Sequence, residues 1–259
     1  MTAPDIPRGR LLLMPNTLDL GAAEVPLTEV LAHGVITAAS RLLHWVVEDA
    51  RSARAFLNRV NKVAPLAQPL QQTLIAELPR PPKGASRPAP ATGPSPWAAL
   101  LAPALAGHDV GLLSEAGLPG VADPGALLVA AAHDLGIPVV ALSGPSAITL
   151  AIAASGLNGQ SFVFHGYLPA ESGARRARLR ELEATSRKLQ QTQVFIETPY
   201  RNAAMLETCL EALQPATRLA IACGLTLAEG WAHTRGVAQW RTAQAALPDR
   251  VPAVFSLLA

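Results

Sequence analysis

The sequence is poor in cysteine and lacks the motifs of the commonest metal and nucleotide sites. Its two cysteines, Cys209 and Cys223, show no metal or redox spacing, so we expect two reduced, buried thiols. The six histidines show no HExxH or other metal spacing, which predicts no metal site. There is no GxGxxG after a strand and no GxxxxGK(S/T), so the usual NAD and nucleoside triphosphate sites are weakly supported.

Charge and long apolar runs are also scarce. Only 15% of the 259 residues are charged and 50% are hydrophobic, which excludes a disordered chain and allows a large core. The net charge of +2 gives no global case for nucleic acid, so RNA binding would need a local basic patch. The apolar run 11–14 is too short for a signal peptide, and 139–157 is interrupted by SGPSA and falls short of a membrane span. We therefore expect a soluble, cytoplasmic protein without a membrane segment.

Strand and helix patterns alternate along the first part of the chain. The expected strands are 11–14, 42–47, 109–115 and 137–144. The expected helices are a segment from Pro26 that breaks near Gly34, then 51–62, 97–107, 124–136 and 145–157. Strand, turn and helix in this order predict an α/β fold with a parallel sheet.

A different pattern begins near Gly159. Strands are expected at 162–166, 193–197, 218–223 and 253–258, with helices at 173–190 and 202–213. This predicts two domains: an N-terminal α/β domain, 1–158, and a mixed α+β C-terminal domain, 159–259. The proline-rich segment 79–96 is predicted to be an exposed, extended loop.

Two turns rich in glycine and proline follow neighbouring strands: SEAGLPGVADPG, 114–125, and SGPSA, 143–147. In open α/β sheets ligands bind beyond the carboxyl ends of the strands. Glycine lets a ligand approach the backbone and proline fixes the turn. Exposed backbone groups would suit a ligand with adenine, ribose and carboxylate parts. Tight connections without a ligand explain the composition equally well.

Five motifs occur in the order found in the tetrapyrrole methylase superfamily: SEAGLPGVADPG, LSGPSA, FVFHGYLP, SGARRARL and FIETPYR. The chain most resembles the ribosomal RNA small-subunit methyltransferase I branch, which methylates a cytidine 2′-hydroxyl. The resemblance implies a two-domain tetrapyrrole methylase fold, with S-adenosylmethionine in the cleft between the domains, and a homodimer.

The resemblance also implies a set of cofactor-binding positions. They follow the first strand, fill the two turns, and recur in the second half of the chain: Pro15, Ser114, Glu115, Ala116, Gly117, Val121, Ala122, Asp123, Ser146, Ala147, Leu168, Leu225 and Thr226. Asp123 precedes Pro124 and could equally cap the following helix.

The acceptor side departs from the family pattern. EDAR, 48–51, stands where the family has EDTR, and the proline-rich segment replaces a stretch rich in histidine and asparagine. In CGLTLAEG, 223–230, the family's charged positions are lost. These changes indicate a divergent paralogue that keeps the methyl-donor site. Besides ribosomal RNA methylation, a small-molecule methyltransferase acting on a tetrapyrrole-like acceptor and a non-catalytic cofactor-binding paralogue remain open.

Methyl transfer to a hydroxyl needs alignment of donor and acceptor and removal of a proton. Glu48 and Asp49 are the candidate proton acceptors, because a strand end delivers them to the rim of the cofactor turns. A strand-end carboxylate that caps the next helix is the alternative.

The candidate RNA-binding residues are arginines: Arg51, Arg175, Arg176 and Arg201. Arg175 and Arg176 belong to ARRARLR, 174–180, the best local basic patch, and each phosphate contact would make affinity depend on salt. A solvated helix face explains the same pattern. Glu197 and Arg201 could form an ion pair or meet an anionic acceptor. The expected partner is ribosomal RNA or the small ribosomal subunit.

Overall fold

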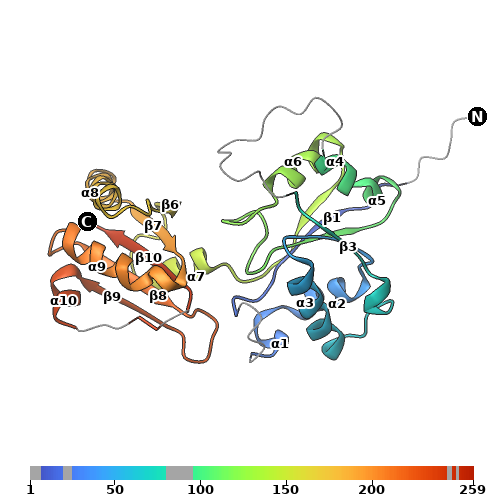
Figure 1. Cartoon of the computed structure of the whole chain (residues 1–259), viewed down its shortest axis with the longest axis horizontal. Helices are drawn as coiled ribbons and strands as arrows, with labels where there is room; N and C mark the ends of the chain where they lie inside the picture. The colour runs from blue at the N-terminus through green and yellow to red at the C-terminus, as the bar shows by residue number, and fades with distance from the viewer. Residues whose placement is uncertain (1–6, 20–24, 80–95, 244–246, 249–250) are drawn as a thin grey trace, which may run out of the picture. The chain divides into compact units, whose positions relative to one another are not determined.

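A computed structural model describes residues 7–19, 25–79, 96–243, 247–248 and 251–259 (Figure 1). The chain divides into two compact units, Met1–Pro145 and Ser146–Ala259, each with its own sheet. The boundary expected between residues 158 and 159 therefore differs from the division in the structure. Helix α7 (Ala147–Ser155) belongs to the second unit, because Ile148, Ala151 and Ile152 pack against that unit's sheet.

The first unit is built on a five-stranded parallel sheet, as the sequence predicts. Its strands lie in the order β3-β2-β4-β1-β5. Their bounds are β1 (Leu11–Met14), β2 (His44–Val47), β3 (Leu74–Glu77), β4 (Val110–Leu113) and β5 (Val139–Ala141). Strands buried on both faces carry nearly continuous apolar runs, and β4, VGLL, is buried along its whole length.

Helices cover both faces of this sheet (Figure 1). On one face, Leu12, Met14 and Trp45 pack in a cluster with residues of α1 (Leu27–Val30), α2 (His33–Arg41) and α3 (Ala50–Val63). On the other face, Leu11, Val46 and Leu112 pack with residues of α4 (Pro96–Leu100), α5 (Ala102–Leu105) and α6 (Ala126–Asp134). The single helix expected at 97–107 is wrong: Pro103 stands in the first turn of α5, so two short helices replace it.

The second unit holds a mixed sheet in the order β6-β7-β10-β8-β9. Strands β6 and β7 are parallel and the remaining pairs are antiparallel. The strands are β6 (Phe162–Tyr167), β7 (Thr192–Glu197), β8 (Arg218–Cys223), β9 (Trp231–Gly236) and β10 (Ala253–Leu258). One face packs on α8 (Ser172–Leu189), α9 (Asn202–Ala212) and α10 (Val237–Thr242), and α7 covers the other. Two short 3-10 helices, η1 (Leu70–Gln72) and η2 (Pro199–Arg201), complete the described elements.

Strands β3 and β9 and helix α10 were not expected from the sequence. The proline-rich loop predicted at 79–96 lies, apart from its two end residues, outside the described residues.

Candidate functional site

The carboxyl ends of three neighbouring strands place the predicted site residues of the first unit at one edge of its sheet. Leu113 of β4 pairs with Met14 of β1 and with Val47 of β2. The residues that follow these strands are Pro15, Glu48 and Ser114. The edge at which ligands bind in α/β sheets therefore carries the loop after β1, the end of β2 and the turn after β4.

Asn16 fastens the loop after β1 to the turn after β4. Its side-chain amide donates to the carbonyls of Ser114, at 3.1 Å, and Glu115, at 3.0 Å. Its backbone N–H donates to the carbonyl of Gly117 at 2.8 Å. Asn16 is buried, so these bonds form away from water and hold the turn in one conformation.

A buried ion pair also anchors the loop after β1. The Arg59 guanidinium of α3 donates to Asp19 at 2.9 and 3.2 Å, to the Thr17 hydroxyl at 3.2 Å and to the carbonyl of Val25 at 2.9 Å. The Asp19 side chain is only 2% exposed. Arg59 and Asp19 therefore position the loop and are not available to a ligand.

The turn after β4 has a backbone that glycine makes accessible. Gly117, Gly120 and Gly125 have φ of 67°, 80° and 132°, the left-handed region that side chains disfavour. Ala122 also lies there, at φ 65°, and such non-glycine residues concentrate at functional sites. Gly120, Val121 and Ala122 are exposed, so this part of the turn can meet a ligand with its backbone.

The loop after β5 closes against the loop after β1. A Cβ on Gly144 would lie 2.1 Å from Cβ of Pro15, which is an impossible contact. A Cβ on Gly117 would lie 3.4 Å from the carbonyl oxygen of Pro145. Only glycine at 144 allows the two loops to approach this closely, so the predicted turns share one edge.

Three carboxylates lie near one another at this edge: Glu48, Glu115 and Asp123. Glu48 Oε2 accepts from the backbone N–H of Glu115 at 3.4 Å. Burial and the neighbouring charge of Glu48 raise the pKa of Asp123 to about 6, with a smaller contribution from Glu115, against a hydrogen bond from the Ser114 side chain. Asp123 therefore carries an acid–base equilibrium near neutral pH that the sequence did not reveal.

Asp49 caps a helix, which was the alternative to its predicted role as a proton acceptor. It is the N-cap of α3, and its side chain accepts from the N–H groups of Arg51 and Ser52 at 2.9 and 2.8 Å. Asp123 does not cap α6, because the N-cap is Gly125 and no side-chain cap bond forms there.

The second unit carries the remaining predicted cofactor residues. Ser146 is the N-cap of α7, followed by Ala147. The side chain of Leu168 is buried in the core with α8, so only its backbone could meet a ligand. Leu225 and Thr226 lie half-buried in the turn after β8, where Thr226 has φ 69°.

The predicted RNA-binding arginines fall into different environments. Arg175 is buried, and its guanidinium donates to the Thr208 hydroxyl and the carbonyl of Ala170. The prediction that Arg175 contacts RNA at the surface is therefore wrong, because its guanidinium is buried and hydrogen-bonded within the second unit.

The other three arginines are accessible to different degrees. Arg176 is about half exposed and pairs with Glu211 at 3.0 Å. Arg201 forms an ion pair with Glu197 at 3.2 Å, which was one of the two roles considered for it, the other being contact with an anionic acceptor. Its side chain remains 26% exposed. Arg51 is exposed.

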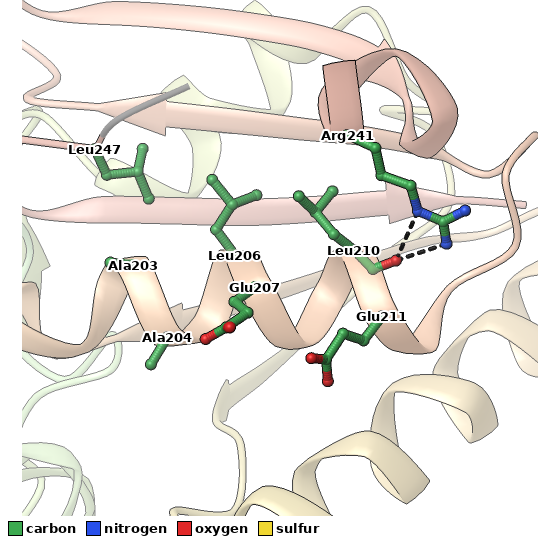
Figure 2. A pocket seen from close by; sticks show the side chains of 8 residues that line it. All are labelled: Ala203, Ala204, Leu206, Glu207, Leu210, Glu211, Arg241 and Leu247. Atoms are coloured by element: carbon green, nitrogen blue, oxygen red, sulfur yellow. Dashed lines mark hydrogen bonds between the residues drawn. The ribbon is translucent and has the colours of Figure 1, made fainter. Parts of the chain in front are cut away.

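A hollow of about 780 Å³ lies beside α9 and α10 (Figure 2). Leu206 and Leu210 of α9 point to one side of the helix, and Glu207 and Glu211 to the other. Arg241 donates to the carbonyl of Leu210 at 2.6 and 3.0 Å, so its charge ties α10 to the end of α9. No predicted site residue lines the hollow.

Metal-binding groups and membrane-spanning helices are both absent from the described residues. No group of three or more histidine, cysteine, aspartate or glutamate residues could hold a metal ion there. None of the helices in those ranges is long and apolar enough to cross a membrane. Both cysteines are free and buried as expected, and burial raises the pKa of Cys209 to about 12.

Comparison of the sequence with known proteins gives one family. Residues 46–235 match the family model described as tetrapyrrole (corrin/porphyrin) methylases. Over 120 residues, 46% of this chain, the sequence is 45% identical to a protein of Mycobacterium tuberculosis named ribosomal RNA small subunit methyltransferase I. The protein of that name from Vibrio cholerae is 40% identical over 122 residues, 47% of the chain. The matched segments span only 41% of the length of each of these relatives.

The fold resembles solved methyltransferases over nearly the whole chain. A uroporphyrin-III-C-methyltransferase from Thermus thermophilus matches with a TM-score of 0.51 at 18% identity, covering 97% of this chain and 92% of that one. The same kind of enzyme, complexed with S-adenosyl homocysteine, matches with a TM-score of 0.51 at 16% identity, over 96% and 97% of the two chains. At such identities the likeness shows a shared two-domain fold.

Proposed function

The chain belongs to the tetrapyrrole (corrin/porphyrin) methylase family, and on that premise we propose that it is an S-adenosylmethionine-dependent methyltransferase that acts on a ribose 2′-hydroxyl of small-subunit ribosomal RNA. The observation that carries the proposal is the turn after β4. Asn16 holds it, three of its glycines adopt left-handed conformations, and its exposed backbone lies at the carboxyl edge of a parallel sheet.

The residues at this edge fit the cofactor. Gly120 and Ala122 are exposed and can present backbone groups to the polar parts of a nucleoside, and Val121 is exposed with its N–H already donating to the carbonyl of Leu118 at 3.3 Å. Pro15 and Gly117 are buried. The proposed contacts of the first unit are those of Pro15 and of the turn after β4, namely Ser114, Glu115, Ala116, Gly117, Val121, Ala122 and Asp123. Those of the second unit are Ser146, Ala147, Leu225, Thr226 and the backbone of Leu168.

When bound, the cofactor supplies a methyl group on a sulfonium that is already activated for displacement. The chain's own task is to align the acceptor oxygen with that methyl group and to accept its proton. Glu48 stays a proposed member of the acceptor side, whereas Asp49 is occupied with the N-terminus of α3.

Ribosomal RNA is the proposed acceptor because the similar curated proteins carry that name. Arg51, Arg176 and Arg201 are the proposed phosphate contacts. We propose further that the protein is cytoplasmic and acts as a homodimer, as the resemblance to the family implies.

A small-molecule acceptor is the second candidate, because the solved structures that match nearly the whole chain are named as uroporphyrin-III methyltransferases. A non-catalytic paralogue is the third, motivated by the altered EDAR motif.

Two measurements separate the three candidates. Calorimetry with S-adenosylmethionine should show binding, and absence of heat at millimolar cofactor would reject the proposal. Labelled cofactor is then offered with deproteinised small-subunit RNA and with a uroporphyrinogen in separate reactions. Label in RNA supports the proposal, label in the tetrapyrrole supports the second candidate, and label in neither supports the third.

A further inference from the structure

Both tyrosines of the chain lie at one edge of the second sheet and are largely exposed. Tyr167 ends β6 and is 60% exposed, and Tyr200 lies in η2, after β7, and is 77% exposed. A tyrosine ring normally contributes most when it is packed against other groups. The two residues belong to FVFHGYLP and FIETPYR, and the proposed function gives neither ring a role.

The ends of neighbouring strands bring the two tyrosines to the same edge. Tyr167 pairs with Ile196 of the parallel strand β7, and η2 begins shortly after that strand ends. The Arg201 guanidinium donates to the carbonyl of Ala170 at 3.3 Å. The residue after Tyr200 is therefore bonded to the segment that follows Tyr167.

A β-bulge changes the direction in which Tyr167 points. Phe164 pairs with Val194 in the regular part of the ladder. Further along, Ile196 pairs with Tyr167 and not with Gly166, so β6 holds one extra residue, and Gly166 has φ 66°. Because side chains alternate between the faces of a strand, the extra residue moves Tyr167 to the opposite face from the one it would take in a regular strand. Bulges that redirect a side chain in this way are common next to functional sites.

This edge also carries the proposed cofactor contacts of the second unit. Leu168, whose backbone is one of them, directly follows Tyr167. Ala253 of β10 pairs with Glu197 at the end of β7 and with Cys223 at the end of β8. The turn after β8, which holds the other proposed contacts, therefore starts at the same edge. The tyrosines border the proposed methyl-donor site.

The charges around the tyrosines favour a polyanion. Segments 162–180 and 198–206 contain five arginines and one carboxylate, Glu171. Glu171 is occupied at the start of α8, where it accepts from two backbone N–H groups at 2.7 and 2.6 Å. Arg176 and Arg201 have partly exposed side chains, although each pairs with a glutamate. Exposed rings beside arginines suit single-stranded nucleic acid, because bases stack on the rings and phosphates meet the guanidinium groups.

We propose that Tyr167 and Tyr200 are stacking positions for unpaired bases of the RNA acceptor, and that they hold the acceptor strand beside the methyl-donor site. The inference rests on the proposed function, whose acceptor is small-subunit RNA, and adds base contacts to its phosphate contacts. Stacking needs the ring and not the hydroxyl, so these positions accept any base.

The test compares two RNA probes by fluorescence anisotropy: a single strand of about ten nucleotides and an abasic strand with the same number of phosphates. The wild type should bind the first strand about 100-fold more tightly, because only that strand has bases to stack on two rings. Tyr167→Ala and Tyr200→Ala should each weaken its binding by about tenfold. Binding of the abasic strand, and the slope of log affinity against log salt, should stay unchanged because the phosphate contacts remain.

Two further variants serve as controls. Tyr200→Phe keeps the ring and should restore most of the affinity that Tyr200→Ala loses. Phe162→Ala removes an exposed ring from the opposite end of β6 and should bind both strands like the wild type. Urea denaturation and sedimentation check that each variant folds and keeps the oligomeric state of the wild type. The comparison of the two strands on the wild type needs no variant.

Three binding results would overturn the inference: equal affinity of the wild type for the two strands, unchanged affinity in either alanine variant, or a loss that affects the abasic strand equally. A change of oligomeric state in Tyr167→Ala or Tyr200→Ala would overturn it as well, because the tyrosines would then lie between copies of the chain.

Binding and methyl transfer separate this inference from the proposed function. If the wild type labels RNA but the alanine variants bind both strands as the wild type does, the inference is lost and the proposed function stands. If the tyrosines give the expected preference for bases but the wild type leaves RNA unlabelled, the proposed function is lost and the stacking positions stand.

Discussion

At the scale of single residues, several charged side chains at the proposed site have structural partners. Arg59 forms an ion pair with Asp19, Asp49 caps the start of α3, and Arg175 donates a hydrogen bond to the Thr208 hydroxyl. Asp19 and Arg175 are buried, Arg59 is nearly so, and Asp49 is partly buried. Their removal should therefore affect folding first, and methyl transfer only through the loop or helix that they hold.

Arg59→Met should lower the free energy of unfolding by about 3 kcal/mol, because Asp19 would be left buried without its cation. Urea denaturation measures the loss. Arg54→Met, on the exposed face of the same helix, should stay within about 0.5 kcal/mol of the wild type. Equal effects of the two substitutions would show that the Asp19 ion pair is not important for stability.

Substitution of Asp49 separates capping from catalysis. Asp49→Asn keeps a side-chain oxygen for the cap but removes the carboxylate, so both stability and the rate of methyl transfer should be preserved. Asp49→Ala should lower the free energy of unfolding by about 1 kcal/mol. If Asp49→Asn folds normally but loses methyl transfer, Asp49 is the proton acceptor after all.

The titration of Asp123 should also appear in the pH dependence of stability. Its pKa is about 6 in the folded protein, above the ordinary value of 3.8, so the native state binds the proton more tightly. This contribution stabilises the fold fully below about pH 4 and is lost as the pH rises through about 6. In urea denaturation the advantage of Asp123→Asn over the wild type should therefore grow between pH 4 and 6. Parallel curves for the two proteins would contradict the raised pKa.

At the scale of elements, the site is made by loops that come together at one edge of a sheet. Pro15 after β1 and Gly144 after β5 are separated by most of the first unit in sequence, yet they touch. The arrangement depends on the parallel order β4-β1-β5, which places the ends of β1 and β5 next to each other.

Gly144→Ala should weaken cofactor binding by about tenfold or more, because its Cβ would lie 2.1 Å from Cβ of Pro15 and would push the loops apart. Calorimetry with S-adenosylmethionine measures the effect. Gly34→Ala is the matched control: nothing lies within 4 Å of its Cβ, and it stands in α2. It should leave affinity unchanged and stabilise the protein by about 0.5–1 kcal/mol. Unchanged cofactor affinity in Gly144→Ala would place the cofactor elsewhere.

The elements that could be predicted are those whose pattern is decided locally. The buried strands β1, β2, β4, β7, β8 and β10 carry apolar runs, and α3 and α8 carry amphipathic patterns, so the sequence predicts them. Strands β3 and β9 lie at sheet edges and have few buried residues, so LIAE and WAHTRG lack a clear pattern.

The same limit applies to the site. Its glycine-rich turn could be located from sequence, because positive φ leaves a glycine pattern. The raised pKa of Asp123 could not, because it depends on burial in the fold and on the charge of Glu48, which comes from a different strand. Nor could the burial of Arg175, because SGARRARL is basic whichever face it turns inward.

At the scale of the whole molecule, a two-unit methylase fold is combined with only three proposed phosphate contacts. The net charge of +2 does not attract RNA over the whole surface, so binding must be local. Of the two arginines that begin the basic patch, only Arg176 has an exposed side chain.

Arg176→Ala should weaken binding of small-subunit RNA and reduce the slope of log affinity against log salt by about 0.7, the value for one phosphate contact on a single strand. Filter binding across a salt series measures it. Arg175→Ala, one residue away and buried, should instead destabilise the fold and leave the salt slope of the folded fraction unchanged. Equal slopes for Arg176→Ala and the wild type would exclude Arg176 from the RNA interface.

The most direct test of the proposed activity is the chemical identity of the methylated product. Small-subunit RNA is incubated with the protein and methyl-labelled S-adenosylmethionine, digested to nucleosides and separated. The proposed function predicts label in a 2′-O-methylated nucleoside with the wild type, and none in a reaction without the protein. Label confined to a base, or RNA without label from a protein that binds the cofactor, would contradict it.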